Sequence, residues 1–273
     1  MPQPVVHPLL LGPSALDIFI GRERELGQLQ DALAHACTGR GQLVLLAGEP
    51  GVGKTCLAEK FTTLARHQHV SVLWGRCWEG DGTPAFWPWV QIVRTYIQQC
   101  PSDTLTIEMG NGAGDIAHVV TEVRERLAAV RPSRTGESDS ARFRFFDSLV
   151  AWLKRAAIRQ PLLLILDDLH WAATSSLLLL RFFARALQDA HILVLGTYRD
   201  TDVHNALPLS EALGALVRES QHVTMVGLAR EEVAQFIHST LGSAPSTGLV
   251  TSVYERTEGN PFFVSELVQV LAR

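Results

Sequence analysis

The amino-acid sequence predicts an α/β fold: a parallel five-stranded sheet flanked by helices, followed by the start of a helical lid. Short apolar runs of strand length alternate with longer segments whose apolar residues recur at helical spacing, which is typical of a parallel sheet with right-handed crossovers. From residue 231 onward the spacing is helical throughout. We therefore expect a core at residues 18–228 and a lid at residues 229–273. Residues 1–17, with four prolines, are expected to form an extended lead-in.

Five short apolar runs are expected to form the strands. Leu162–Asp167 is apolar up to its last residue, as strands covered on both faces are. The other four runs are residues 42–47, 70–74, 191–196 and 222–226.

Helices are expected where apolar residues recur every three or four positions. These segments are residues 21–38, 55–66, 87–99, 141–159, 177–187, 233–241 and 262–271. For the helix at 177–187 we expect an N-cap at Thr174 or Ser175. Within residues 101–139 the pattern is weak, and it indicates loops at 110–114 and 132–140 around a helix near 119–130. The aromatic segment 86–89 is expected to pack in the core under the sheet edge and not to form a ligand cage.

Composition excludes several classes of protein. The chain has 273 residues, of which 47% are hydrophobic, so it can bury a full core. A formal net charge of −4 argues against a domain that grips nucleic acid through its own charge. The four cysteines show no metal-binding spacing, no apolar run is long enough to cross a membrane, and the N-terminus lacks a basic signal-peptide region. We therefore expect a cytoplasmic protein with no direct binding to nucleic acid or membrane.

The glycine-rich turn after the first strand matches the Walker A pattern G-x-x-x-x-G-K-[ST]. Its glycines allow consecutive backbone N–H groups to face phosphate oxygens, and the helix that follows adds the positive end of its dipole. The lysine is expected to reach the β- and γ-phosphates, and Thr55 to bind Mg²⁺. The chain has few lysines, yet one stands in this turn. The predicted nucleotide-binding residues are Gly48, Glu49, Pro50, Gly51, Val52, Gly53, Lys54, Thr55 and Cys56.

Two aspartates end the apolar strand at 162–167, as in a Walker B motif. At the carboxyl edge of a parallel sheet, Asp167 would lie beside the phosphate loop and hold Mg²⁺. Asp168 would orient or deprotonate the attacking water, although an aspartate there can also cap a helix. Arg199, which follows the next strand, would sense or stabilise the γ-phosphate or else be a surface arginine. The sequence assigns no role to His170 or Trp171.

Taken in order, these segments resemble a known family. FIGREREL at 19–26, the loop at 48–55, DDLHWA at 167–172, GTYRD at 196–200 and GNPFF at 259–263 look like the AAA-type ATPase module of the STAND signal-transduction ATPases. The nearest resemblance is to large ATP-binding LuxR-type (MalT-like) transcriptional regulators. This resemblance implies that Phe19, Gly21 and Arg22 lie near adenine and ribose, that Pro261 touches the base, and that Arg199 is the first sensor. Ala173 departs from the family, which often has an acidic residue there.

The resemblance implies a regulatory switch that binds ATP or ADP with Mg²⁺ and hydrolyses ATP slowly to ADP and phosphate. The last helix is apolar on most sides and ends with the chain, so we expect C-terminal sensor or effector domains outside this sequence, and nucleotide-dependent self-association is a further expectation. Two alternatives remain open: an AAA+ turnover ATPase that acts as a loader or remodeller, and the regulatory module of a cyclase or protein kinase. A small-molecule kinase would need an acceptor site that the sequence does not show.

Overall fold

The computed structural model describes residues 18–80, 84–127, 138–200 and 207–271. They form two compact units. The larger unit comprises residues 23–50 and 54–225, and the smaller comprises residues 1–22, 51–53 and 226–273, in each case so far as they are described. Each unit is considered by itself below.

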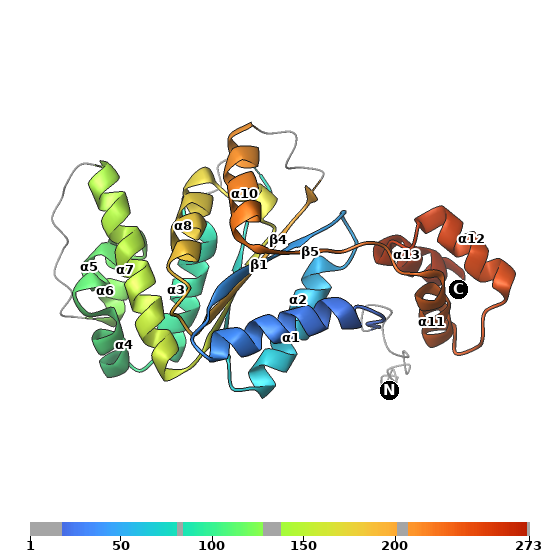
Figure 1. Cartoon of the computed structure of the whole chain (residues 1–273), viewed down its shortest axis with the longest axis horizontal. Coiled ribbons are helices and arrows are strands. Elements are labelled where there is room, and N and C mark those ends of the chain that lie inside the picture. The colour runs from blue at the N-terminus through green and yellow to red at the C-terminus, as the bar shows by residue number, and fades with distance from the viewer. Residues whose placement is uncertain (1–17, 81–83, 128–137, 201–206, 272–273) are drawn as a thin grey trace, which may run out of the picture. The chain divides into compact units, whose positions relative to one another are not determined.

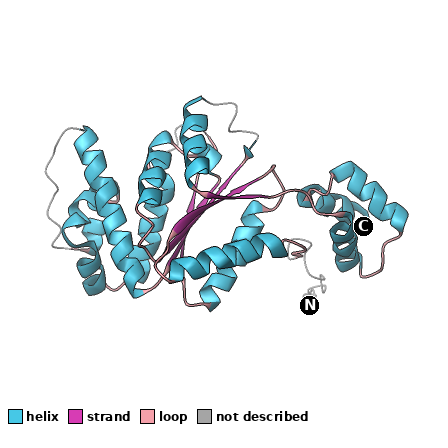
Figure 2. Cartoon of the chain, in the orientation of Figure 1, coloured by secondary structure: helices cyan, strands magenta, loops and turns pink. Residues whose placement is uncertain are grey.

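A parallel sheet lies at the centre of the larger unit (Figures 1 and 2). Its order is β2-β3-β4-β1-β5 and every pairing is parallel, so the predicted five-stranded sheet is confirmed. The strands are β1 (Gln42–Ala47), β2 (Ser71–Arg76), β3 (Leu162–Asp167), β4 (Ile192–Tyr198) and β5 (Gln221–Thr224).

The register brings the carboxyl ends of four strands to one edge of the sheet. Arg76 at the end of β2 pairs with Asp167 at the end of β3, and Ala47 at the end of β1 pairs with Tyr198 at the end of β4. Every residue of β3 and β4 is buried, which explains why these strands are apolar without alternation. Polar side chains at this edge are therefore held close together by a rigid framework.

Helices cover both faces of this sheet (Figure 1). On one face, α1 (Glu23–Cys37) packs on β1 and β4, and α2 (Lys54–His67) packs on β2 and β3. The other face carries α3 (Trp87–Gln99), α8 (Thr174–Arg185) and α10 (Leu207–Glu219). Outside them lies α7 (Ser138–Arg159), which packs against α8 and against the short helices α4 (Ser102–Met109) and α5 (Ala113–Val119). A third short helix, α6 (Glu122–Arg126), packs against α5 and α3.

Some local predictions were wrong. In place of a loop at 110–114 and one helix near 119–130, the chain forms α4, a 3₁₀ turn at Gly110–Gly112, α5 and α6, while residues 128–137 lie outside the described part. Helices of five to eight residues contain too few turns for a clear periodicity. The expected cap at Thr174 or Ser175 is also wrong, because Ala173 occupies the N-cap and Thr174 is the first helical residue.

The aromatic segment at the start of α3 packs in the core, as predicted. Trp89 is 1% exposed, contacts the ring of Phe183 in α8, and donates a hydrogen bond from Nε1 to the Ser176 carbonyl at 3.2 Å. Phe86 lies against Phe145 and Phe146 of α7. These contacts fix α3 against its neighbours, and α3 in turn covers β2.

The smaller unit contains α11 (Arg230–Leu241), α12 (Thr247–Thr257) and α13 (Pro261–Leu271). Their buried residues form a core of their own, on which Ile18 and Ile20 pack, and its members are Leu228, Val233, Phe236, Ile237, Val253, Val264 and Val268. At the start of α11, the Glu232 carboxylate accepts the Ala229 N–H at 2.6 Å, which satisfies one of the N–H groups near the start of the helix.

Within the described ranges, none of the helices is both long and apolar enough to pass through a bilayer.

Gly75 provides a test of the packing between β2 and α3. A Cβ at this position would lie 2.2 Å from the Pro88 carbonyl oxygen, whereas a Cβ at Gly27 in α1 would meet nothing within 4 Å. Gly75→Ala is therefore expected to lower the free energy of unfolding by about 1–3 kcal/mol, since backbone must move. Gly27→Ala is expected to raise it by up to about 1 kcal/mol. Urea unfolding of both variants measures the effect, and equal midpoints would contradict this packing.

Candidate functional site

The loop between β1 and α2 is built for a turn that side chains disfavour. Gly53 has φ of 98°, a left-handed conformation that glycine adopts without a Cβ clash. The next residue, Lys54, is the first residue of α2, so the N-terminus of this helix directly follows the loop. Free N–H groups and the positive end of a helix dipole make such a position favourable for an anion.

Lys54 is directed back onto its own loop. Its Nζ donates to the carbonyl oxygens of Gly48 at 2.7 Å and Glu49 at 2.9 Å, and the residue is 7% exposed. Burial lowers the pKa of Lys54, and the positive charge of Arg199 lowers it further, while nearby aspartates, Asp168 first among them, oppose the shift. A buried ammonium held only by neutral carbonyls would gain from a negatively charged acceptor.

Asp167 is fully buried and is bound by side chains from three other elements. Thr197 of β4 donates to Oδ1 at 2.7 Å. Thr55 of α2 donates at 3.2 Å to Oδ1 and lies 3.3 Å from Oδ2. Arg76 of β2 approaches Oδ2 with both Nε and Nη2 at 3.1 Å. Thr197 Oγ1 also accepts the backbone N–H of Asp168 at 2.9 Å, so one hydroxyl orients both aspartates.

Asp168 has an unusual backbone and a perturbed carboxyl group. Its φ of 60° places a non-glycine residue in the left-handed region, a feature that concentrates at functional sites. Burial raises the pKa of Asp168, the charge of Asp167 raises it further, and Arg199, Arg76 and Lys54 oppose the shift. A carboxyl group whose pKa is raised is a better proton acceptor once it is ionised.

Thr55 and Asp167 are suited to a magnesium ion. A hydroxyl and a carboxylate are the hard oxygen donors that Mg²⁺ prefers, and they already lie within hydrogen-bond distance of each other. Among the described residues, no group of three His, Cys, Asp or Glu side chains could hold a metal. Mg²⁺ usually takes one or two carboxylates and completes its shell with water and phosphate oxygens, so the Thr55 hydroxyl and the Asp167 carboxylate suit it.

The larger unit thus brings together five of the predicted residues. A hydrogen bond joins Thr55 to Asp167, and Asp167, Asp168 and Arg199 all interact electrostatically with Lys54. Gly48 is buried at the base of the loop, whereas Glu49, Pro50 and Cys56 are exposed.

Other predicted residues belong to the smaller unit. Within it, Arg22 is 8% exposed and donates from Nη2 to the Val52 carbonyl at 3.1 Å, and the Phe262 N–H lies 3.3 Å from the Gly51 carbonyl. Phe19, Gly21 and Pro261 are half-buried.

Two residues that contact Asp167 were not predicted from the sequence. Thr197 lies inside the quoted GTYRD segment, yet only its arginine received a role. Arg76 ends β2 and pairs in register with Asp167. The rule that functional groups gather at the carboxyl ends of parallel strands would have found both.

Comparison with known families matches residues 18–195 to the AAA ATPase domain. The chain belongs to this family. A curated relative, an uncharacterized protein of Rhizobium meliloti (strain 1021), is 25% identical over 189 residues. The matched segment makes up 66% of this chain and 18% of that protein, so the chain spans less than a fifth of the relative's length.

Solved structures agree with the family in fold. A STAND protein with a tetratricopeptide repeat sensor from Pyrococcus horikoshii is similar at a TM-score of 0.51 and 19% identity, over 90% of this chain and 29% of that one. The Cdc6p protein of Pyrobaculum aerophilum is similar at a TM-score of 0.55 and 17% identity, over 96% of this chain and 65% of that one. The ORC2 protein of Aeropyrum pernix was solved as ADPNP–ADP complexes. It is similar at a TM-score of 0.53 and 14% identity, over 96% of this chain and 68% of that one. At these identities the likeness concerns the fold alone.

Thr197→Val tests whether the AAA module depends on the hydroxyl that orients both aspartates. The change removes a donor to Asp167 and an acceptor for the Asp168 N–H, so the free energy of unfolding is expected to fall by about 1–3 kcal/mol. Thr224→Val, at the exposed end of β5, is the matched control and is expected to change it by less than about 0.5 kcal/mol. Equal losses in urea unfolding would mean that the buried contacts of Thr197 contribute nothing.

Asp168→Asn tests the pKa of the second aspartate. A raised pKa in the folded state means that ionised Asp168 destabilises the fold at neutral pH, and that this cost disappears as the pH falls through the folded pKa. The variant is therefore expected to be more stable than the wild type at pH 7, by no more than about 1 kcal/mol because water screens the partly exposed carboxyl. The difference should narrow on acidification. Urea unfolding between pH 7 and pH 4.5 measures it, and a difference that widens on acidification would contradict the shift.

Proposed function

We propose that this AAA module is a regulatory switch that binds ATP or ADP with Mg²⁺ and hydrolyses ATP slowly. The observation that carries the proposal is the arrangement of Lys54 and Thr55, at the start of α2, against the fully buried Asp167. Family membership and the phosphate-loop sequence support the nucleotide-binding part of this proposal.

Each side chain has a role that follows from its position. Lys54 would exchange the Gly48 and Glu49 carbonyls for the β- and γ-phosphate oxygens. Thr55 and Asp167 would hold Mg²⁺, which neutralises charge on the phosphates. Asp168 would orient or deprotonate the attacking water, and its raised pKa favours proton transfer to it. Arg199 interacts electrostatically with Lys54 and Asp168, and it would sense the γ-phosphate.

The remaining predicted residues are proposed to recognise the rest of the nucleotide. Phe19, Gly21 and Arg22 would lie by the adenine and ribose, Pro261 would touch the base, and the loop through Cys56 would enclose the phosphates. The contact of Arg22 with Val52 supports this, because it joins the Phe19–Arg22 segment to the loop. We keep the division into a lead-in at 1–17, a core at 18–228 and a lid at 229–273 as part of the proposal.

A switch needs contacts that differ between its two states. The γ-phosphate provides them, because Lys54, Arg199 and the Mg²⁺ held by Thr55 and Asp167 would contact ATP differently from ADP. In the proposed cycle, ADP holds the lid closed, exchange for ATP releases it, and slow hydrolysis with Asp168 resets it.

We further propose that the module is the N-terminal part of a cytoplasmic LuxR-type transcriptional regulator. C-terminal sensor and effector domains would then be its partners, with nucleotide-dependent self-association and no nucleic acid or membrane partner of its own. The motif order and the fold-level likeness to a STAND protein support this assignment.

An AAA+ turnover ATPase is the main alternative, and the fold-level likeness to Cdc6p and ORC2 favours it. A loader or remodeller would use the same loop and aspartates with an arginine supplied by a neighbouring subunit. The regulatory module of a cyclase or protein kinase would differ from the leading proposal only in its effector.

Identification of any nucleotide that co-purifies with the chain tests the proposal. The wild type is expected to release stoichiometric ADP on denaturation. Lys54→Ala is expected to release little or none, since loss of a charge-assisted contact weakens binding by about 10- to 100-fold. Chromatography of the supernatant measures both, and Lys60→Ala, an exposed lysine further along α2, is the matched control.

Three outcomes separate the readings. ADP in the wild type and in Lys60→Ala, but not in Lys54→Ala, supports a switch held by its product. An empty wild type that hydrolyses added ATP rapidly favours the turnover enzyme. An empty wild type that neither binds nor hydrolyses ATP would refute the nucleotide switch.

A further inference from the structure

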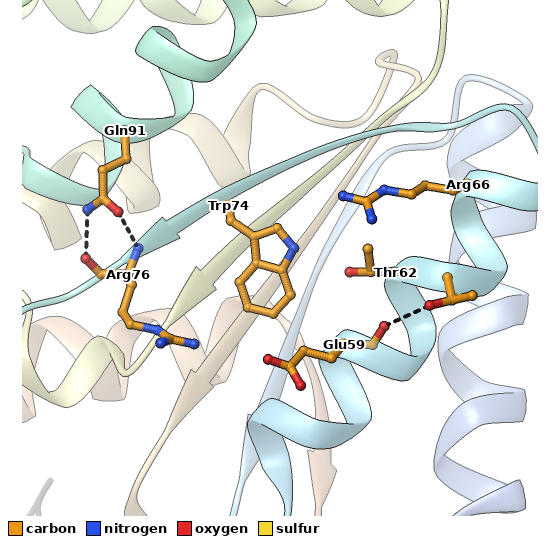
Figure 3. Close-up of a pocket in the computed structure, with 7 residues that line it drawn as sticks. Glu59, Thr62, Arg66, Trp74, Arg76 and Gln91 are labelled. Carbon is orange, nitrogen blue, oxygen red and sulfur yellow. Dashed lines mark hydrogen bonds between the residues drawn. The ribbon is translucent and has the colours of Figure 1, made fainter. Parts of the chain in front are cut away.

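A cavity of about 490 Å³ lies beside the candidate site (Figure 3). It is formed by α2, β2 and α3, within the larger unit, and its lining residues are Glu59, Thr62, Thr63, Arg66, Trp74, Arg76 and Gln91. Arg76 belongs to both places, because its side chain lines the cavity while its guanidinium binds Asp167.

Arg76 supplies the positive charge that the buried Asp167 requires. A carboxylate removed from water is costly unless a cation and hydrogen bonds compensate it. Among the described contacts of Asp167, the two threonines provide hydroxyls and Arg76 provides the formal positive charge. Nε and Nη2 both lie 3.1 Å from Oδ2, while the Arg76 side chain remains 56% exposed.

A magnesium ion at Thr55 and Asp167 would compete with this arginine. The ion needs an oxygen of Asp167, and a guanidinium already bound to the same carboxylate repels a divalent cation at contact distance. Arg76 contacts Oδ2 alone, so an ion on Oδ1 would weaken the Arg76 contact through repulsion, and the stronger charge of Mg²⁺ favours the ion. The two cations would therefore compete for one buried carboxylate.

The cavity gives the displaced side chain a place to go. Gln91 of α3 holds the Arg76 backbone, donating to its carbonyl at 2.8 Å and accepting its N–H at 3.3 Å, so the side chain can move while the strand end stays fixed. In Figure 3 the Trp74 ring lies between Arg76 and the α2 residues Glu59, Thr62 and Arg66. An indole face and the Glu59 carboxylate are both favourable partners for a guanidinium.

We propose that Arg76 is a tethered counter-cation of Asp167 that leaves it for the Trp74 cavity when Mg²⁺ binds. Arg76 thereby sets the magnesium concentration at which the switch responds. This role rests on the proposed function for its biological meaning, but the exchange itself needs only Arg76, Asp167 and Mg²⁺. Arg76 is a positioning residue, since it acts on the metal through Asp167.

Thermal unfolding of the full chain against magnesium concentration tests the exchange without any nucleotide. In EDTA, Arg76→Gln is expected to unfold at a lower temperature than the wild type, because Asp167 loses its counter-charge. Added Mg²⁺ is expected to raise the unfolding temperature of this variant more than that of the wild type. The magnesium concentration that gives half of this rise, called the magnesium midpoint, is expected to be about tenfold lower for the variant. That factor corresponds to an Arg76-bound state that holds about nine tenths of the wild-type molecules.

Two further variants separate the role of Arg76 from a general effect of removing a positive charge. Arg40→Gln removes an exposed arginine between α1 and β1, outside the cavity, and is expected to keep the wild-type magnesium midpoint. Arg76→Lys retains the charge with one donor group in place of two and is expected to give an intermediate midpoint, even if Arg76→Gln folds poorly. Equal magnesium midpoints for the wild type, Arg76→Lys and Arg40→Gln would overturn the proposal.

A fluorescent ADP analogue separates this proposal from the proposed function. If the wild type binds the analogue, the magnesium concentration at half-maximal analogue binding is expected to be lower in the Arg76 variants and unchanged in Arg40→Gln. If no variant binds the analogue, yet the magnesium midpoints of unfolding differ as described, the switch fails and the Arg76 exchange stands. If the wild type and all variants bind the analogue with the same magnesium midpoint, the Arg76 exchange is refuted and the proposed nucleotide switch is not.

Discussion

The buried carboxylate of Asp167 is the constraint on which the rest of the site depends. A charge with no exposure to water must be compensated from every side, and here the compensation comes from α2, β2 and β4 together. These elements are distant in sequence, so satisfying one carboxylate fixes where the phosphate loop, the sheet edge and the second aspartate lie relative to one another. The apolar strands around it provide the rigidity that keeps this arrangement in place.

Several features of the same site lower the stability of the fold. Asp168 adopts a left-handed backbone and carries a carboxyl group whose ionisation the fold disfavours. Lys54 is buried, and within the described part of the chain its hydrogen-bond acceptors are the neutral carbonyls of Gly48 and Glu49. Features of this kind persist where the surrounding structure enforces them, and they are expected where a ligand later supplies the missing contacts. Phosphate oxygens and a divalent cation would be favourable partners for the polar groups of the loop and the sheet edge.

Membership in the AAA ATPase family accounts for the core and leaves the biological role to be tested. STAND, Cdc6p and ORC2 proteins share this fold at low identity, so the sheet and the loop do not distinguish a switch from a turnover enzyme. The distinction depends on how nucleotide binding is coupled to other domains or subunits. Arg76 would be one local element of such coupling, because it connects the candidate metal site to a cavity open at the surface.

Sequence alone determined the parallel sheet, the phosphate loop and the carboxylates at 167 and 168, because these depend on local patterns: apolar runs, glycine spacing and a charge at a strand end. It failed within residues 101–127, where three short helices carry too little periodicity to be recognised. Tertiary structure decided which side chains meet Asp167. Thr197 and Arg76 lie 30 and 91 positions from it, and only the order and register of the strands bring them into contact. Hydrogen bonds and charge pairs act over a few ångströms in space, and separation along the chain does not reveal them.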